Sequence, residues 1–165
     1  MVVEVLYDEP IEVLTAADHP LAQFDKVPWF ELVRYPQVVF KDGYGMQRLV
    51  QERFERFGAT LQAVLEVNTL DAFRGVVRQG ELIALLPRSA LVEARQDPTL
   101  SVRSLASSDS ATVESGLTRQ VVMVTTQDRL QIPPIQHFWQ LVKQLIIPQF
   151  EQQEKPPSVK NLQVR

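Results

Sequence analysis

A loop with two glycines, residues 41–46 (KDGYGM), is the part of this sequence best suited to bind a small ligand. It follows a short apolar run, and a helical pattern begins directly after it. In open α/β sheets ligands bind beyond the carboxyl ends of strands, and the free N–H groups of a helix's first turn favour an anion. The alternative is an ordinary strand–helix loop in which the glycines serve backbone geometry. The candidate anion-binding residues are Lys41, Asp42, Gly43, Tyr44, Gly45 and Met46.

Asn68 and Thr69 form a second candidate, at the start of the next predicted helix. An alternating apolar run, residues 61–67, ends just before them. Either side chain can accept a hydrogen bond from a first-turn N–H group, so either can cap the helix. Since capping and ligand contact are compatible, we include both residues in the predicted ligand site.

No set of residues favours catalysis or metal binding. His19 lies in a predicted turn and His137 in the last predicted helix, and neither has a ligand partner at a spacing such as HExxH. The sequence has no Gly-x-Ser-x-Gly motif and no cysteine. We therefore predict no enzymatic activity, no metal and no cofactor. Two acidic pairs are expected to be solvated loop carboxylates, namely Asp8 with Glu9 and Asp109 with Glu114.

Composition bounds the class of protein. The 165 residues are 45% hydrophobic and 22% charged, which is typical of a soluble globular chain with one domain or two small lobes. The net charge of -3 provides no general basic surface for nucleic acid. The first ten residues lack a signal-peptide pattern, and no apolar run approaches the roughly 20 residues of a membrane span. Together with the absence of cysteine, this predicts a cytoplasmic location.

The elements that must position the candidate site centre on residues 65–87. Apolar residues recur at helical spacing from 70 to 77, and Gly80 can end that helix in a left-handed conformation. The run LIALL, residues 82–86, is apolar throughout and precedes Pro87. Such a run is typical of a strand buried on both faces, and it predicts the centre of a parallel α/β sheet.

The remaining elements follow from the same patterns. The other predicted strands cover residues 3–7, 11–16, 37–40, 61–67, 100–105 and 119–126, with Pro10 between the first two. The other predicted helices cover residues 46–57 ended by Gly58, 88–94, and a last one from Pro133 or Pro134 to Pro148, while residues 27–35 are predicted to form a short helix or a turn. Residues 106–116 are predicted to form an exposed polar loop.

Three stretches in this order resemble the effector-binding half of LysR-type transcriptional regulators. They are LYDEP at residues 6–10, HPLA at 19–22, and the helix, glycine, apolar strand and proline around Gly80. Members of that family usually have a second glycine two residues after the first, where this chain has Leu82. The resemblance extends over residues 6–148, which is most of the chain.

The resemblance implies an α/β fold like that of type 2 periplasmic binding proteins, with a central mixed, mostly parallel sheet flanked by helices. In that scheme residues 1–105 form a crossover strand and the second lobe. Residues 106–148 return to the first lobe as its last strand and helix, and residues 149–165 form a disordered tail. The winged helix-turn-helix and most of the first lobe have no counterpart here.

The resemblance also implies a ligand-sensing domain that binds a small, anionic metabolite and changes oligomer geometry. DNA would be bound only through an N-terminal domain that this chain lacks, and no membrane is involved. Its protein partner would be a second copy or a full-length regulator. Two rival interpretations remain: a protein-interaction module that needs no ligand, and a solute-binding protein of the same fold. The expected dimer surface is the outer face of the 46–57 helix, with Arg48, Gln51, Glu52 and Glu55.

Overall fold

The computed structural model describes residues 1–41, 45–106 and 116–151. The predicted site residues Asp42, Gly43 and Tyr44 lie outside the described residues, as do residues 107–115 of the predicted loop and residues 152–165 of the predicted tail. The chain divides into two compact units. The larger is Glu9–Arg119, and the smaller combines Met1–Asp8 with Gln120–Arg165.

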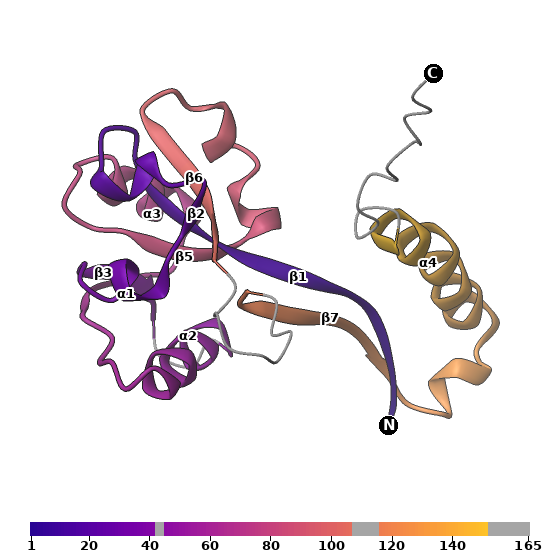
Figure 1. Ribbon diagram of the computed structural model, residues 1–165. Coiled ribbons are helices and arrows are strands. Elements are labelled where there is room, and N and C mark those ends of the chain that lie inside the picture. Colours follow the sequence, from indigo (N-terminus) through magenta and orange to yellow (C-terminus); the bar gives the residue numbers. More distant parts are fainter. Residues whose placement is uncertain (42–44, 107–115, 152–165) are drawn as a thin grey trace, which may run out of the picture. The chain divides into compact units, whose positions relative to one another are not determined.

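A mixed β-sheet forms the frame of the larger unit (Figure 1). Along one path its strands lie in the order β2 (Lys26–Val27), β6 (Leu100–Leu105), β1 (Val2–Ala16) and β5 (Ala84–Pro87). β1 is antiparallel to both β5 and β6, whereas β2 is parallel to β6. The predicted α/β class with a mixed sheet is therefore confirmed.

A second, parallel pair of strands carries the candidate site. β3 (Gln37–Phe40) pairs with β4 (Ala63–Val67), and the register places Phe40 opposite Val67. A parallel bridge between Gln37 and Ile83 links β3 to the segment that leads into β5. Because the two strands run in the same direction, the chain leaves both of them at the same edge.

Strand β1 runs unbroken through Pro10, so the prediction of two strands separated by this proline is wrong. Proline removes a backbone donor and fixes φ near −65°, which an extended strand tolerates where no ladder needs that donor. The ladder with β5 starts at Ile11 and the ladder with β6 at Glu12, so Pro10 precedes both.

The burial predicted for residues 82–86 is confirmed for residues 83–86, whereas Leu82 is only half-buried, and the neighbours of this segment are not those expected. β5 forms an antiparallel ladder with β1, from Ile11 opposite Pro87 to Leu14 opposite Ala84. Among the described residues, its segment has a parallel neighbour only through the Gln37–Ile83 bridge. A continuous apolar run indicates burial on two faces and carries no information about strand direction.

Helices cover both faces of the sheet. α1 (Trp29–Leu32) and α2 (Gly45–Arg56) pack on a core that includes Val13, while α3 (Leu70–Val77) packs on a core that includes Leu14. Val13 and Leu14 are neighbours on β1, and successive strand side chains point to opposite faces. The two cores are therefore separate layers, one on each side of one sheet.

Local chemistry fixes the ends of α2 and α3. The Ala72 amide donates to Thr69 Oγ1 at 3.3 Å, so Thr69 and not Asn68 caps α3. Gly58 after α2 and Gly80 after α3 both have a positive φ, 64° and 94°, and confirm the predicted helix ends. The predicted 88–94 helix is instead two 3₁₀ turns, η2 (Arg88–Leu91) and η3 (Ala94–Gln96), which are tighter than α-helical turns and common as short connectors.

In the smaller unit β7 (Thr118–Thr125) pairs with β1, and α4 (Pro133–Glu151) follows. α4 begins at Pro133, as predicted, but it continues through Pro148 to Glu151, so the predicted helix end at Pro148 is wrong and residues 149–151 belong to the helix. Near a helix end a proline removes one backbone bond, which the helix can lose. Among the described residues, no helix is long and apolar enough to cross a membrane.

Candidate functional site

The structure brings the two parts of the predicted ligand site to one edge of the β3–β4 pair. The Lys41 amide donates to the Val67 carbonyl at 3.2 Å, and Asn68 and Thr69 follow Val67 directly. α2 begins at Gly45 after the first strand, and α3 begins at Leu70 after the second. Two helix N-termini, each with partial positive charge, therefore start from neighbouring strands.

Exposure differs among the predicted ligand residues. Lys41, Gly45, Asn68 and Thr69 are exposed, so their polar groups are accessible from solvent. Met46 is buried and belongs to the same core as Val50 and Phe54. Its side chain is therefore committed to packing, and its backbone is the part available to a ligand.

A small pocket, partly open to solvent, lies between β3, β5 and the first turns of α2. Gln37 lies in its wall and is 1% exposed. The side-chain amide of Gln37 has no hydrogen-bond partner among the described residues, which is costly for a buried polar group. Sequence reasoning missed Gln37, because a glutamine in a short apolar run gives no sign of its burial. The other lining residues are Val38, Val39, Phe40, Met46, Gln47, Val50 and Leu85.

The predicted dimer residues all lie on the exposed face of α2. Arg48 pairs with Glu52 at 3.2 Å, and Gln51 Nε2 donates to Glu55 Oε1 at 3.2 Å. The opposite face of the helix carries buried residues that include Val50 and Phe54. This confirms an amphipathic helix with a charged outer surface.

Glu9 is the clearest failure of the sequence interpretation, which placed it in a solvated acidic pair with Asp8. Asp8 is exposed, but Glu9 is only 3% exposed. The Ser89 amide donates to Glu9 Oε1 at 2.7 Å, and Arg119 Nε donates to Glu9 Oε2 at 2.8 Å. Burial raises the pKa of Glu9, but the bonds from Ser89 and Arg119 outweigh it, and the pKa lies below its ordinary value.

Glu12, three residues later on β1, is a second buried carboxylate, also 3% exposed. Arg95 donates to Glu12 Oε2, and Arg88 Nη2 lies 3.4 Å from Glu12 Oε1. Ser104 Oγ also lies 3.4 Å from Oε1. The sequence signal for these buried carboxylates was the position of Glu9 and Glu12 in a strand that is otherwise largely apolar. A charge buried there needs a partner of opposite charge.

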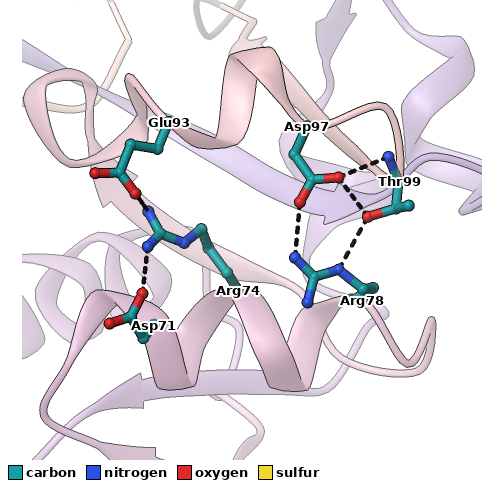
Figure 2. A network of polar contacts seen from close by, with 6 residues as sticks. All are labelled: Asp71, Arg74, Arg78, Glu93, Asp97 and Thr99. Atoms are coloured by element: carbon teal, nitrogen blue, oxygen red, sulfur yellow. Dashed lines mark hydrogen bonds and ion pairs between the residues drawn. The ribbon is translucent and has the colours of Figure 1, made fainter.

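A third polar network joins α3 to the segment that follows η2 (Figure 2). Arg74 donates to Asp71 and, at 2.5 Å, to Glu93. Arg78 donates to Asp97 at 2.7 Å and to Thr99 Oγ1 at 2.9 Å. The hydroxyl of Thr99 and the guanidinium of Arg78 lower the pKa of Asp97 to about 2.

His19 has a structural position in the turn. His19 is buried, and its Nδ1 accepts a hydrogen bond from the Leu21 amide at 3.1 Å. Its ring packs edge-on against the ring of Tyr35, with 4.6 Å between the two ring centroids. Burial lowers the pKa of His19, although nearby Asp18 acts in the opposite direction. Within residues 1–41, 45–106 and 116–151, no group of three or more metal-ligating side chains is found.

Comparison with known proteins gives the family. The model of the family described as the LysR substrate binding domain matches residues 1–146. The chain belongs to this family. The resemblance drawn from LYDEP, HPLA and the Gly80 unit is thereby confirmed.

Two curated relatives of this LysR substrate-binding chain are cyanobacterial. A probable nitrogen assimilation transcriptional activator of Synechococcus elongatus is 49% identical over 144 residues, covering 87% of this chain and 44% of that protein. A protein of the same description from Synechocystis is 45% identical over 142 residues, covering 86% and 46%. The chain thus spans less than half the length of these regulators.

Solved LysR-type regulatory domains share the fold. The CcmR regulatory domain of Synechocystis in complex with 2-PG has a TM-score of 0.71 at 20% identity, covering 88% of this chain and 66% of that one. The effector-binding domain of QuiR in complex with shikimate has a TM-score of 0.73 at 19% identity, covering 90% and 67%. The predicted type 2 periplasmic-binding-protein-like fold is confirmed.

Proposed function

We propose that this chain is the sensing part of a transcription regulator and that it binds a small anionic metabolite at the carboxyl edge of β3 and β4. The observation that carries the proposal is the bond from the Lys41 amide to the Val67 carbonyl, which sets the starts of α2 and α3 side by side. Two helix N-termini and one exposed lysine make an electropositive edge. The proposed ligand residues are Lys41, Asp42, Gly43, Tyr44, Gly45, Met46, Asn68 and Thr69.

The related structures support a small ligand. The CcmR regulatory domain was solved with 2-PG, and the QuiR domain was solved with shikimate, which carries a carboxylate. Both complexes have the same fold as this chain.

Calorimetric titration of the purified chain with a set of small carboxylates and inorganic phosphate tests the proposal. We expect saturable binding of at least one anion and a loss of about tenfold in affinity in Lys41→Met, which removes the charge and keeps the side-chain length. Lys26→Met, which removes an exposed lysine from β2, is the matched control and should bind as the wild type does. Binding that is equally strong in Lys41→Met would contradict the proposed site.

We also propose that the outer face of α2 contributes to self-association, through Arg48, Gln51, Glu52 and Glu55. Strand β4, which follows α2 in the chain, supports this proposal. It is an edge strand of the β3–β4 pair, and its apolar residue Val64 is 64% exposed. Sedimentation of the wild type against Arg48→Ala/Glu52→Ala tests it, with Arg34→Ala/Glu31→Ala, an ion pair between α1 and the turn after it, as the control pair. Equal association in all three proteins would count against the α2 surface.

The curated relatives are named as transcriptional activators, and we propose that sequence-specific DNA binding belongs to the part of such a regulator outside this chain. The division into residues 1–105, 106–148 and 149–165 likewise stays a prediction, apart from the helical residues 149–151. A gel-shift with the purified chain should show no tight, sequence-dependent binding. Such binding would overturn this assignment.

A second candidate function is a protein-interaction module that needs no ligand. It is favoured by α4, whose apolar side chains Phe138, Leu141 and Leu145 are all exposed. Co-purification with a longer regulator that is unchanged by every anion in the titration set would favour this alternative.

A further inference from the structure

The backbone of residues 88–99 links the three polar networks into one chain of contacts within the larger unit. Figure 2 shows its first part, in which Arg74 of α3 pairs with Glu93 and Arg78, the residue after α3, pairs with Asp97. Between these two acidic residues, Arg95 donates to Glu12 of β1. The contacts therefore pass from a helix, through one short irregular segment, into the central strand.

The chain of contacts ends at the boundary of the unit. Glu12 also pairs with Arg88, whose neighbour Ser89 donates its amide to Glu9. Glu9 in turn binds Arg119 through both Nε and Nη2, at 2.8 and 2.7 Å. Glu9 and Arg119 are the first and last residues of the larger unit, so their ion pair joins its point of entry to its point of exit.

We propose that residues 88–99 act as a rigid bracket that ties α3 to the two strands joining the larger unit to the rest of the chain, with Glu9 and Glu12 as its positioning residues. Because residues 88–99 would not bend, a displacement of α3 would also displace the Glu9–Arg119 pair. The inference does not depend on the proposed ligand site, and its test needs no ligand.

Two features distinguish a bracket from scattered surface pairs. Glu9 and Glu12 are almost fully buried. Removing the arginine partner of either would leave an uncompensated charge in the protein interior, which is strongly unfavourable. Each carboxylate also has partners on two separate segments of the chain, so neither can move with one partner alone. Exposed pairs such as Arg34–Glu31 have neither property.

Hydrogen exchange of individual amides in the full chain tests the proposal. The reporter is the Ile11 amide, which donates to the Leu117 carbonyl at 2.8 Å beside the Glu9–Arg119 pair. The reference is the Val38 amide, which donates to the Ile83 carbonyl at 3.0 Å; Val38 packs in the same core as Phe73 and Val77 of α3, so it reports any general loosening around that helix. The perturbing variant is Arg74→Met, which removes the ion pairs that Arg74 of α3 makes with Asp71 and Glu93.

We expect Arg74→Met to accelerate exchange at Ile11 by about fivefold or more relative to the change at Val38. In a Glu12→Gln background the same substitution should have little further effect on Ile11, because the bracket is already broken. Arg34→Met removes an ion pair of the same i,i+3 spacing, between Glu31 of α1 and the turn after it, and should leave the ratio of the two exchange rates unchanged.

Equal acceleration at Ile11 and Val38 in Arg74→Met would mean general loss of stability and would overturn the proposal. An unchanged Ile11 amide, or additive effects of Arg74→Met and Glu12→Gln, would overturn it as well. If Arg74→Met does not fold, Glu93→Gln alters the exposed partner of the same contact and serves as the perturbing variant.

Discussion

Glu9 and Arg119 form a bidentate ion pair across 110 positions of sequence, with Arg119 Nε and Nη2 lying 2.8 and 2.7 Å from the same carboxylate oxygen. The carboxylate is buried, and its other oxygen accepts the Ser89 amide. One side chain therefore holds both the start of η2 and the strand that leaves the larger unit.

This arrangement predicts acid sensitivity. The folded-state pKa of Glu9 is lower than its value of 4.5 in the unfolded chain, so its stabilising contribution is fully present above pH 4.5 and is lost as the pH falls through the folded-state pKa. Urea unfolding at a series of pH values should show a shallower loss of stability on acidification in Glu9→Gln. The exposed Glu66→Gln should keep the wild-type slope, and identical slopes in all three proteins would contradict the prediction.

Core packing predicts a large contrast between two phenylalanines. Phe54 of α2 is 1% exposed and Phe30 of α1 is 70% exposed. Phe54→Ala should lower the free energy of unfolding by about 3–5 kcal/mol, because it removes buried apolar surface and leaves a cavity. Phe30→Ala should change it by less than about 0.5 kcal/mol. Chemical denaturation of the two variants measures the contrast, and comparable losses would show that the packing around α2 is not as described.

The cap of α3 predicts a specific role for Thr69. Thr69→Ala removes the oxygen that accepts from the Ala72 amide and should cost about 1 kcal/mol of stability. Thr69→Ser keeps that oxygen and should retain most of the stability. Asn68→Ala, at the neighbouring position that does not cap, should have a smaller effect. A larger loss in Asn68→Ala than in Thr69→Ala would reverse the assignment of the cap.

Two glycines close in sequence predict opposite effects of alanine. Gly80 has a φ of 94°, so Gly80→Ala is strained and should destabilise the chain by about 1 kcal/mol or more. Gly75 lies inside α3, and an added Cβ there meets nothing within 4 Å, so Gly75→Ala should stabilise it by up to about 1 kcal/mol. Thermal unfolding measures both, and shifts of the same sign would contradict the two conformations.

Local signals in the sequence were sufficient for much of the fold. Thr69, Gly58 and Gly80 act on their own neighbours, and the structure places them at helix ends as predicted. Pro10 and Pro148 misled the prediction for a related reason. A proline lacks an N–H group and breaks an element only where that donor is needed. In strand β1 this depends on partner strands elsewhere in the chain, whereas in α4 it depends on how close Pro148 lies to the end of the helix.

The polar framework could not be found in the same way. Glu9 with Arg119, and Glu12 with Arg95, meet only after the sheet has formed, and one sequence does not reveal such pairings. The proximity of Lys41 to Asn68 and Thr69 could be predicted from the sequence, since it follows from two adjacent parallel strands. Gln37 was not, because a single glutamine has no periodicity to reveal its burial.

The bond from the Ile11 amide to the Leu117 carbonyl, two residues inside each boundary of the larger unit, has a consequence for evolution and for engineering. A unit whose two ends adjoin can be carried as an insertion within another chain without separating the strands on either side of it. Compact pieces with adjacent ends are also those that tolerate circular permutation. The Glu9–Arg119 ion pair and the Ile11–Leu117 hydrogen bond thus hold together the two ends of a region that has the form of a transferable unit.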